Sequence, residues 1–278
     1  MRPVDKLIGA YVGFFTVIIV VRGVSEDLMQ LWLLTAHALI AVLFFAFTKL
    51  KSQHRTGRII HDLYPLLLLP AFYAELGMTS LLSGIEATFE RDAVVQGWEA
   101  TVFGGQISYY WIRQFPSVFW SGILHLAYVL YYPIIVIGPV FLVARGVSDK
   151  GRKVLLATMI AFIACYVVFA LYPVAGPNYA FEHPTGPVRE VWSARLVYWL
   201  LSHGSAFGTA FPSSHVAATV AATAALWQVW RGLALVVLMP TVLLVVGTVY
   251  CQMHYGIDAA VGIALGIGAG VVGVRIRA

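Results

Sequence analysis

Long apolar runs occupy most of the chain, and short polar stretches separate them. Runs that are long enough to cross a bilayer, or nearly so, lie at about 7–24, 28–48, 63–83, 117–144, 154–172, 212–230, 232–252 and 255–274. A transmembrane helix needs about 20 predominantly apolar residues. The pattern therefore predicts an all-α integral membrane protein, a bundle of about eight transmembrane helices and of at least six.

Composition agrees with a membrane protein. Of the 278 residues, 60% are hydrophobic and only 11% are charged, which is far from the balance of a soluble domain of this length. No internal repeat or low-complexity segment is visible, so one membrane domain, residues 1–278, accounts for the whole length. Cys165 and Cys251 form no disulfide or metal-binding motif and are expected to be small apolar packing residues.

Basic residues predict the orientation in the membrane. Loops rich in Lys and Arg stay in the cytoplasm, and a cytoplasmic N-terminus places thirteen of the eighteen basic residues on that side, together with the C-terminus. These are Arg2, Lys6, Lys49, Lys51, Arg55, Arg58, Arg145, Lys150, Arg152, Lys153, Arg231, Arg275 and Arg277. The outer side receives the acidic residues Glu26, Asp27, Glu86, Glu90, Asp92, Glu99, Glu182 and Glu190. The net charge of +5 therefore mostly reflects the orientation in the membrane. The sequence has no basic stripe interleaved with aromatic residues, so nothing in it indicates a nucleic-acid partner.

A first polar motif, PSSH, stands at the head of the apolar run 212–230. Its proline suits a first helical turn. The amides and hydroxyls of Ser213 and Ser214 then lie at the positive end of the helix dipole, where a phosphate oxygen would be stabilised. His215 would stand beside that phosphate, on the outer side of the membrane.

A second polar motif, HYGID at 254–258, stands at the head of the last run, also on the outer side. His254 and Asp258 are four residues apart, so on a helix they share one face and the carboxylate can hold one ring nitrogen. The other nitrogen is then free to attack. Each motif alone also fits an ordinary helix start or a packed histidine, but ionisable groups are costly at membrane depth and usually functional there. Together the motifs indicate a phosphotransfer site.

Two outer loops are long enough to affect the site. Residues 84–116 mix acidic and aromatic residues, which suits a short helix at the lipid interface, either as an anchor or with a role toward substrate. Residues 173–211 begin with a turn-rich stretch containing Asn178 and Tyr179, which we expect to contact substrate, and continue into an amphipathic segment at about 188–201. This loop leads directly into the first motif and is expected to cover the site.

The two motifs resemble those of a known family. FPSSH at 211–215, followed after one further run by HYGID, resembles the second and third signature motifs of the type 2 phosphatidic acid phosphatase superfamily, and the HYxxD wording resembles its inositol phosphorylceramide synthase branch. Weaker similarities to the same branch extend the resemblance over roughly residues 90–270. They are Trp98-Glu99 with Phe103-Gly104, Leu124-His125 with Tyr128, Tyr172-Pro173 with Gly176-Pro177, and Pro184 with Gly186. The resemblance implies two accessory helices in residues 1–62 and a six-helix catalytic core in residues 63–278.

The resemblance also implies roles for the motif residues. His254 would be the nucleophile that forms a phosphohistidine, Asp258 would orient it, and His215 would protonate the leaving alkoxide. Water or a lipid alcohol would then take the phosphoryl group. No metal or other cofactor is implied, because helix-end amides and neighbouring donors can stabilise the developing charge.

Three phosphate-binding cations of the family's phosphatases are missing here. Their places correspond to Phe169, the Gly-Pro pair at 176–177, and Thr248. A phosphomonoester dianion normally needs Arg or Lys donors, whereas a singly charged diester needs fewer. Substitutes would be Arg189 and Arg195, with Arg113 next, although Arg195 equally fits a solvated helix face.

These features favour an enzyme that moves a phospho-head-group from a phospholipid donor to a lipid-alcohol acceptor, as inositol phosphorylceramide synthases do. One alternative is a phosphatase that hydrolyses phosphatidic acid-type or isoprenyl phosphate monoesters. The other is a non-catalytic transporter, although neither inverted repeats nor broken midplane helices are visible. The head group and the oligomeric state stay open.

Two further polar residues lie inside apolar runs. Glu75 is expected to pair with a donor such as His125 or a tyrosine, and lining a lipid path is the alternative. His37 is expected to be a hydrogen-bonded packing residue.

Overall fold

Fourteen helices and no β-strand make up the regular structure of the described residues, 1–22, 28–50 and 54–277, in the computed structural model. The loop residues Glu26, Asp27 and Lys51 lie outside this part of the chain. The helices are α1 (Pro3–Arg22), α2 (Leu28–Lys49), α3 (Arg55–Leu82), α4 (Ile85–Phe103), α5 (Ile107–Gln114), α6 (Val118–Val129), α7 (Tyr131–Ala144), α8 (Ser148–Leu171), α9 (Pro177–Ala180), α10 (Pro187–Glu190), α11 (Trp192–Gly204), α12 (Ser214–Val229), α13 (Arg231–Tyr250) and α14 (Gly256–Arg275).

Six of the described helices, α1, α2, α3, α8, α13 and α14, are long and apolar enough to cross a membrane. The expected all-α membrane fold with at least six spans is therefore confirmed. The run at 117–144 was expected to be one helix, but the chain bends by 42° between α6 and α7. Pro133 explains the bend, because it has no N–H to donate to the carbonyl of Val129 and its ring crowds that carbonyl. α12, with 16 residues, is shorter than the six.

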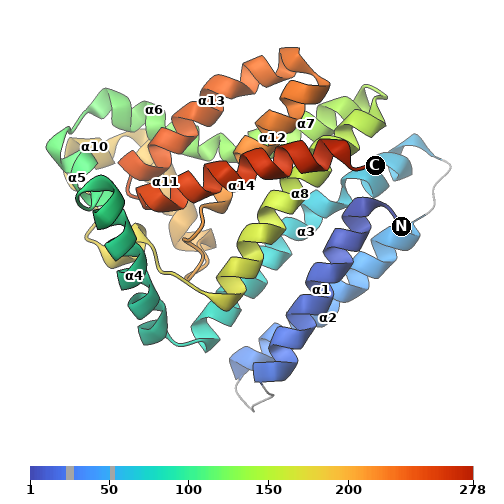
Figure 1. Ribbon diagram of the computed structural model, residues 1–278, viewed down its shortest axis with the longest axis horizontal. Coiled ribbons are helices and arrows are strands. Elements are labelled where there is room, and N and C mark those ends of the chain that lie inside the picture. Colours follow the sequence, from blue (N-terminus) through green and yellow to red (C-terminus); the bar gives the residue numbers. More distant parts are fainter. Residues whose placement is uncertain (23–27, 51–53, 278) are drawn as a thin grey trace.

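The central helix of the bundle is α12, which packs against α14, α8, α13 and α7 (Figure 1). A stripe of glycines on α14, Gly262, Gly266 and Gly270, faces α12 at the contact. A Cβ atom on Gly266 would lie 2.6 Å from the Ala217 carbonyl oxygen, and one on Gly262 would lie 2.8 Å from the Ser213 carbonyl oxygen. The missing side chains let the two motif-bearing helices approach closely.

The two N-terminal helices lie beside the rest of the bundle, with α1 against α8 and α2 against α3. A polar cluster joins them to α3: the Nδ1 atom of buried His37 lies 2.6 Å from a carboxyl oxygen of buried Glu75, and its Nε2 atom lies 2.9 Å from the Thr16 hydroxyl. Glu75 was expected to pair with His125 or a tyrosine, but its partner is His37. His125 instead contacts Ser121.

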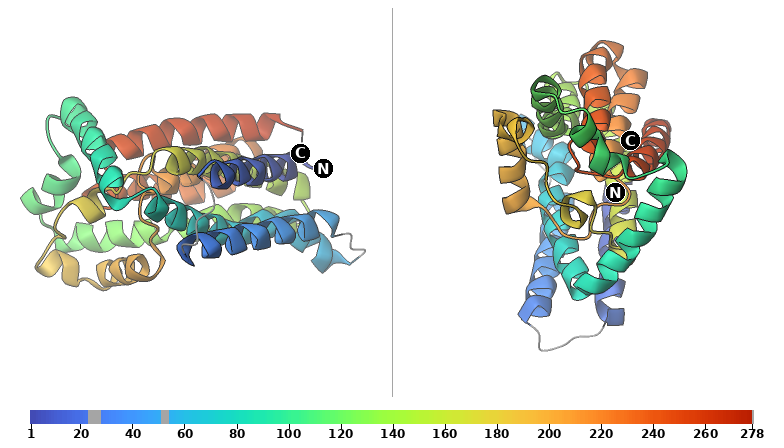
Figure 2. Two further views of the ribbon diagram at one scale, coloured as in Figure 1. Left: turned by 90° about the horizontal axis from the view of Figure 1, so that it is seen from below. Right: turned by 90° about the vertical axis from the view of Figure 1, so that its left-hand side faces the viewer.

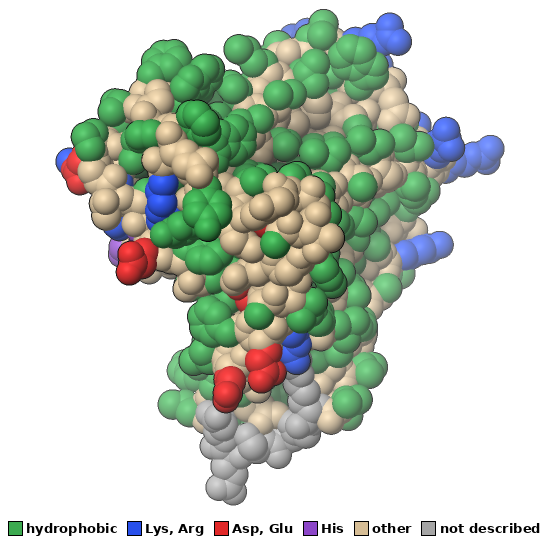
Figure 3. Space-filling model, turned by 60° about the vertical axis from the view of Figure 1, so that its left-hand side comes forward, with side chains coloured by type: hydrophobic (Ala, Val, Ile, Leu, Met, Phe, Trp, Pro, Cys, Tyr) green, Lys and Arg blue, Asp and Glu red, His purple; other side chains and the backbone are tan. Residues whose placement is uncertain are grey.

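Both termini lie at one end of the molecule, and α4, α5 and α10 lie at the other (Figures 1 and 2). At the terminal end, Arg2 and Arg152 both contact the carboxylate of Asp62, and Arg55 donates to the carbonyl of Ala144. Lys and Arg side chains gather on this side in Figure 3, and most acidic side chains visible there lie toward the opposite end. The charge asymmetry read from the sequence is thus a property of the folded molecule.

Both long loops contain helices. Residues 84–116 were expected to form one short helix, but they form the 19-residue α4 and the eight-residue α5. Residues 173–211 contain α9, α10 and α11. The amphipathic segment expected at about 188–201 is α11, Trp192–Gly204, with a short helix before it. These segments surround the starts of α12 and α14.

Candidate active site

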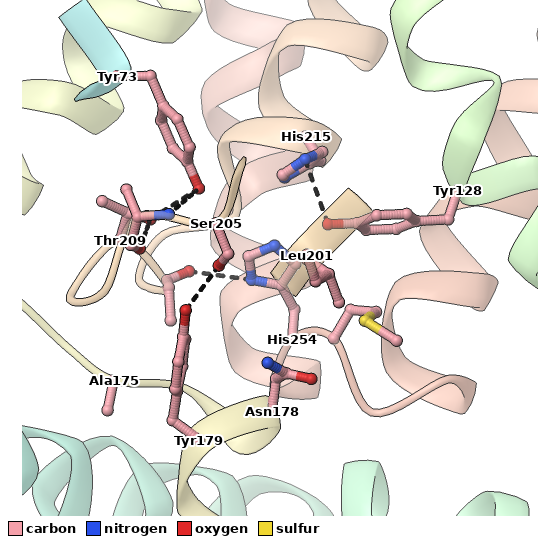
Figure 4. A pocket seen from close by; sticks show the side chains of 13 residues that line it. Tyr73, Tyr128, Ala175, Asn178, Tyr179, Leu201, Ser205, Thr209, His215 and His254 are labelled. Carbon is pink, nitrogen blue, oxygen red and sulfur yellow. Dashed lines mark hydrogen bonds between the residues drawn. The ribbon is translucent and has the colours of Figure 1, made fainter. Parts of the chain in front are cut away.

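Two loop segments meet beside the starts of α12 and α14. The Val174 amide donates to the carbonyl of Gly208, and the Ala210 amide donates to the carbonyl of Val174, at 3.1 Å each. This short bridge holds the two ends of the long outer loop together. They border a cavity of about 40 Å³ (Figure 4), lined by Tyr73, Tyr128, Ala175, Asn178, Tyr179, Leu201, Ser205, Ala206, Thr209, Ala210, His215, Met253 and His254.

His254 reaches the cavity from the loop before α14. Its Nδ1 atom lies 3.1 Å from the carbonyl oxygen of Ala210. A carbonyl only accepts hydrogen bonds, so Nδ1 carries the proton and Nε2 keeps its lone pair. The expectation that His254 and Asp258 share a helix face is wrong, because the helix begins at Gly256.

The two residues of the second motif are nevertheless neighbours. A carboxyl oxygen of Asp258 lies 3.5 Å from His254 Nδ1. The same oxygen accepts a hydrogen bond of 2.9 Å from the Tyr255 amide, so Asp258 also caps the start of α14. The helix start therefore fixes the carboxylate beside the imidazole.

His215 faces His254 across the cavity, with 5.6 Å between the ring centroids. It is the second residue of α12, and its ring packs against the rings of Tyr128 and Tyr131. Its Nε2 atom lies 3.3 Å from the Tyr128 hydroxyl (Figure 4). The fold thus brings the two histidines of the sequence motifs, 39 positions apart, to one cavity.

The model of a protein family described as the PAP2 superfamily matches residues 106–272, which is more than half of the chain. The chain belongs to the PAP2 superfamily. Membership assigns it phosphatase or phosphotransferase chemistry, and its apolar helices agree with a membrane lipid substrate. No curated protein and no solved structure was found to match.

The first motif of this PAP2 superfamily protein is tied to the second. Ser213 caps α12 by accepting from the Val216 amide at 3.3 Å, and its own amide donates to the Asp258 carbonyl at 3.1 Å. Ser213 and Ser214 are buried and lie outside the cavity lining. Within the described chain, the amides of Ser214 and His215 donate to no acceptor, so this helix end keeps two N–H groups for an anion.

The expected substitute cations lie elsewhere. Arg189 stacks over the ring of Tyr198, and exposed Arg195 pairs with Glu190. No Lys, Arg, Asp or Glu is among the described residues that line the cavity. Arg189 and Arg195 are therefore not part of the cavity as it stands.

Arg113 supports the site indirectly through a residue that sequence reasoning missed. Gln252, in the left-handed region with φ 61°, accepts a hydrogen bond of 2.7 Å from Arg113 and donates to the carbonyls of Pro177 and Glu182. It thereby connects the His254 loop to the outer loop. No motif distinguishes this glutamine, and only its place two residues before His254 points to it.

The rest of the polar lining consists of hydroxyl and amide groups. Asn178 and Tyr179, both expected to contact substrate, line the cavity from the short helix α9. The Tyr179 hydroxyl donates to Ser205 at 2.8 Å, and the Tyr73 hydroxyl lies 3.2 Å from that of Thr209 (Figure 4). Within the described residues, no group of three or more His, Cys, Asp or Glu side chains is placed to hold a metal ion.

Proposed function

We propose that the protein is a membrane lipid phosphotransferase that moves a phospho-head-group from a phospholipid to a lipid alcohol. One observation carries this proposal: the cavity shared by His254 and His215 has no cationic side chain in its described lining. A phosphomonoester dianion is normally held by Arg or Lys, whereas a diester carries a single negative charge. The lining therefore favours a phosphodiester donor.

The first step forms a covalent intermediate. The lone pair of His254 Nε2 bonds to phosphorus, and the bond from phosphorus to the lipid oxygen of the donor breaks. Protonated His215 gives its proton to that oxygen, so the donor lipid leaves as a neutral alcohol. The two free amides at the start of α12 are suited to stabilise charge on the phosphoryl oxygens.

The second step regenerates the enzyme. The hydroxyl of the acceptor lipid gives its proton to His215 while its oxygen bonds to phosphorus, and the bond from phosphorus to Nε2 breaks. Asp258 supports the positive charge that His254 carries in the intermediate. Water in place of the lipid alcohol would release the phospho-head-group as a phosphomonoester, and the same two steps on a phosphomonoester donor would release inorganic phosphate.

The lining also favours a particular kind of head group. A choline or ethanolamine head group carries a positive charge, and no described Asp or Glu lines the cavity to pair with it. Hydroxyl and amide groups of Tyr73, Asn178, Tyr179, Ser205 and Thr209 are suited to an uncharged head group with several hydroxyls. This agrees with the resemblance to inositol phosphorylceramide synthases.

A reconstitution experiment tests the proposed function. The purified protein in liposomes receives phosphatidylinositol with ceramide, or phosphatidic acid alone, and the products are separated while inorganic phosphate is measured. We expect a new phosphosphingolipid and diacylglycerol from the first mixture, at a higher rate than phosphate release from the second. His254→Ala serves as the inactive control.

Other results would identify an alternative. Faster release of inorganic phosphate from phosphatidic acid, without transfer from the diester, would make the protein a lipid phosphate phosphatase. Lipid movement across the membrane with no change in covalent structure would indicate a transporter. Either outcome would overturn the phosphotransferase proposal.

A further inference from the structure

Two acidic residues of α4 contact the loop that carries His254 and are not part of the cavity lining. Asp92 and Glu99 lie seven residues apart, about two helical turns, and so share a face of α4. Both side chains are fully buried, whereas Glu86 and Glu90 on the same helix are exposed. The helix itself, Ile85–Phe103, ends before residue 106, where the family match begins.

Glu99 binds the first amides of α14. One of its carboxyl oxygens accepts from the Gly256 amide at 3.1 Å, and the other accepts from the Ile257 amide at 2.9 Å. Helix-start amides have no partner within their own helix, and the helix dipole favours a negative charge beside them. With Asp258 on the Tyr255 amide, carboxylates occupy three successive amides directly after His254.

Asp92 connects the same loop to the outer loop. One of its oxygens accepts from the Tyr255 hydroxyl at 2.8 Å, and the other accepts from the Gly176 amide at 2.7 Å. The Asp92 oxygen that accepts from Tyr255 also accepts a hydrogen bond of 2.8 Å from the side-chain amide of Gln96, one turn along α4. Asp92 thus ties the residue next to His254 to the segment that borders the cavity.

Burying two carboxylates costs free energy that only specific contacts recover. Burial raises the pKa of Glu99, and the hydrogen bonds from Ile257 and Gly256 oppose that shift. Asp258 caps only the Tyr255 amide, so the Gly256 and Ile257 amides depend on Glu99. The contacts of Glu99 and Asp92 converge on the backbone next to His254.

We propose that Glu99 and Asp92 are positioning residues, which together fix the loop at 254–257 so that His254 Nε2 points at the bound phosphoryl group. They act through His254 and do not touch the cavity. The inference rests on His254 being the nucleophile, as in the proposed function, but it holds for a diester or a monoester substrate. Displacements of about 1 Å in a reacting group can cost about 100-fold in rate.

The test compares three variants of the full-length protein in liposomes: Glu99→Gln, Asp92→Asn and, as the matched control on the exposed face of α4, Glu90→Gln. The glutamine keeps the size of Glu99, but its NH2 group cannot accept a hydrogen bond. One of the Gly256 and Ile257 amides therefore loses its acceptor. Loss of a hydrogen bond to a charged group predicts a kcat about 30-fold below that of the parent for Glu99→Gln. Its KM should stay within about threefold of the parent value, because the cavity lining is intact. Glu90→Gln should match the parent.

Hydrogen–deuterium exchange gives a readout that needs no turnover. Peptides covering 252–260 should exchange faster in Glu99→Gln and Asp92→Asn, while peptides from α8 and α13 stay unchanged. An unchanged kcat, or a general increase in exchange along the chain, would overturn the positioning role. If the parent protein turns over only phosphatidic acid, the proposed function fails. The same comparison of kcat values on phosphatidic acid then still tests the positioning role.

Tyr255→Phe provides a second, gentler variant. It removes only the hydroxyl that donates to Asp92 and leaves that carboxylate bonded to Gly176. We expect a kcat about fivefold lower, since a single hydrogen bond contributes roughly 1 kcal/mol. Identical kinetics in this variant, together with normal kinetics in Asp92→Asn, would exclude Asp92 from positioning.

Discussion

The proton of His254 sits on Nδ1 because a backbone carbonyl, which only accepts hydrogen bonds, lies 3.1 Å from that atom. The lone pair therefore stays on Nε2, which is the nucleophile in the proposed mechanism. The ring of His215, in contrast, has one hydrogen-bond contact among the described residues, with the Tyr128 hydroxyl at 3.3 Å. These contacts suit the proposed roles, in which His254 attacks phosphorus and His215 transfers the proton.

The two histidines should therefore respond differently to the leaving group. With a lipid alcohol as leaving group, His215→Gln should lower kcat about 1,000-fold, since a positioned general acid contributes typically 10²–10⁴-fold. With a nitrophenyl phosphodiester, whose leaving group needs no proton, the loss should shrink to about tenfold. Parallel assays on both substrates measure this, and His254→Ala should be inactive on each. Equal losses for His215→Gln on the two substrates would contradict its role as acid.

Asp258→Asn should be milder than His254→Ala. Asparagine can still accept from the Tyr255 amide, and the Ala210 carbonyl still sets the tautomer. What is lost is the negative charge 3.5 Å from Nδ1, which stabilises a positively charged histidine. We expect kcat to fall about 30-fold, or about 2 kcal/mol in the barrier. Full activity would show that Asp258 only caps the helix.

At the scale of elements, the position of the site depends on how closely α14 approaches α12. Gly266→Ala should destabilise the protein, because the new Cβ would lie 2.6 Å from the Ala217 carbonyl oxygen; overpacking of this kind costs typically about 1–3 kcal/mol. Gly268→Ala is the matched control two residues away, where a Cβ meets nothing within 4 Å. Thermal unfolding in detergent should show a lower midpoint only for Gly266→Ala. A lower midpoint for both variants would attribute the effect to the helix itself.

Sequence reasoning found the helices and the motif histidines, because apolar runs and polar helix starts are local signals. It missed the break between α6 and α7, since apolarity continues through Pro133. It also missed the pair of His37 with Glu75 and the contacts of Glu99. His37 and Glu75 are 38 residues apart in the sequence, and Glu99 lies more than 150 residues from Gly256. Such contacts depend on how each helix is rotated about its axis and where it lies along the bundle, which a hydropathy pattern does not indicate.

At the scale of the whole molecule, the distribution of charge predicts which end faces the cytoplasm. The end that carries the termini holds Arg2, Arg55 and Arg152, whereas the cavity with both histidines lies toward the opposite end. Because basic loops stay in the cytoplasm, we infer cytoplasmic termini and a site at the outer face. The donor lipid would then come from the outer leaflet.

Cysteine labelling tests this orientation. The native thiols are unsuited as probes, because Cys165 and Cys251 are both fully buried. Single cysteines at exposed Glu86, near the start of α4, and at exposed Lys150, near the start of α8, report on the two ends instead. A membrane-impermeant maleimide should label Glu86→Cys in intact cells and Lys150→Cys only after the membrane is opened. The reverse order would place the histidines at the cytoplasmic face, and the substrate would have to be a lipid of the inner leaflet.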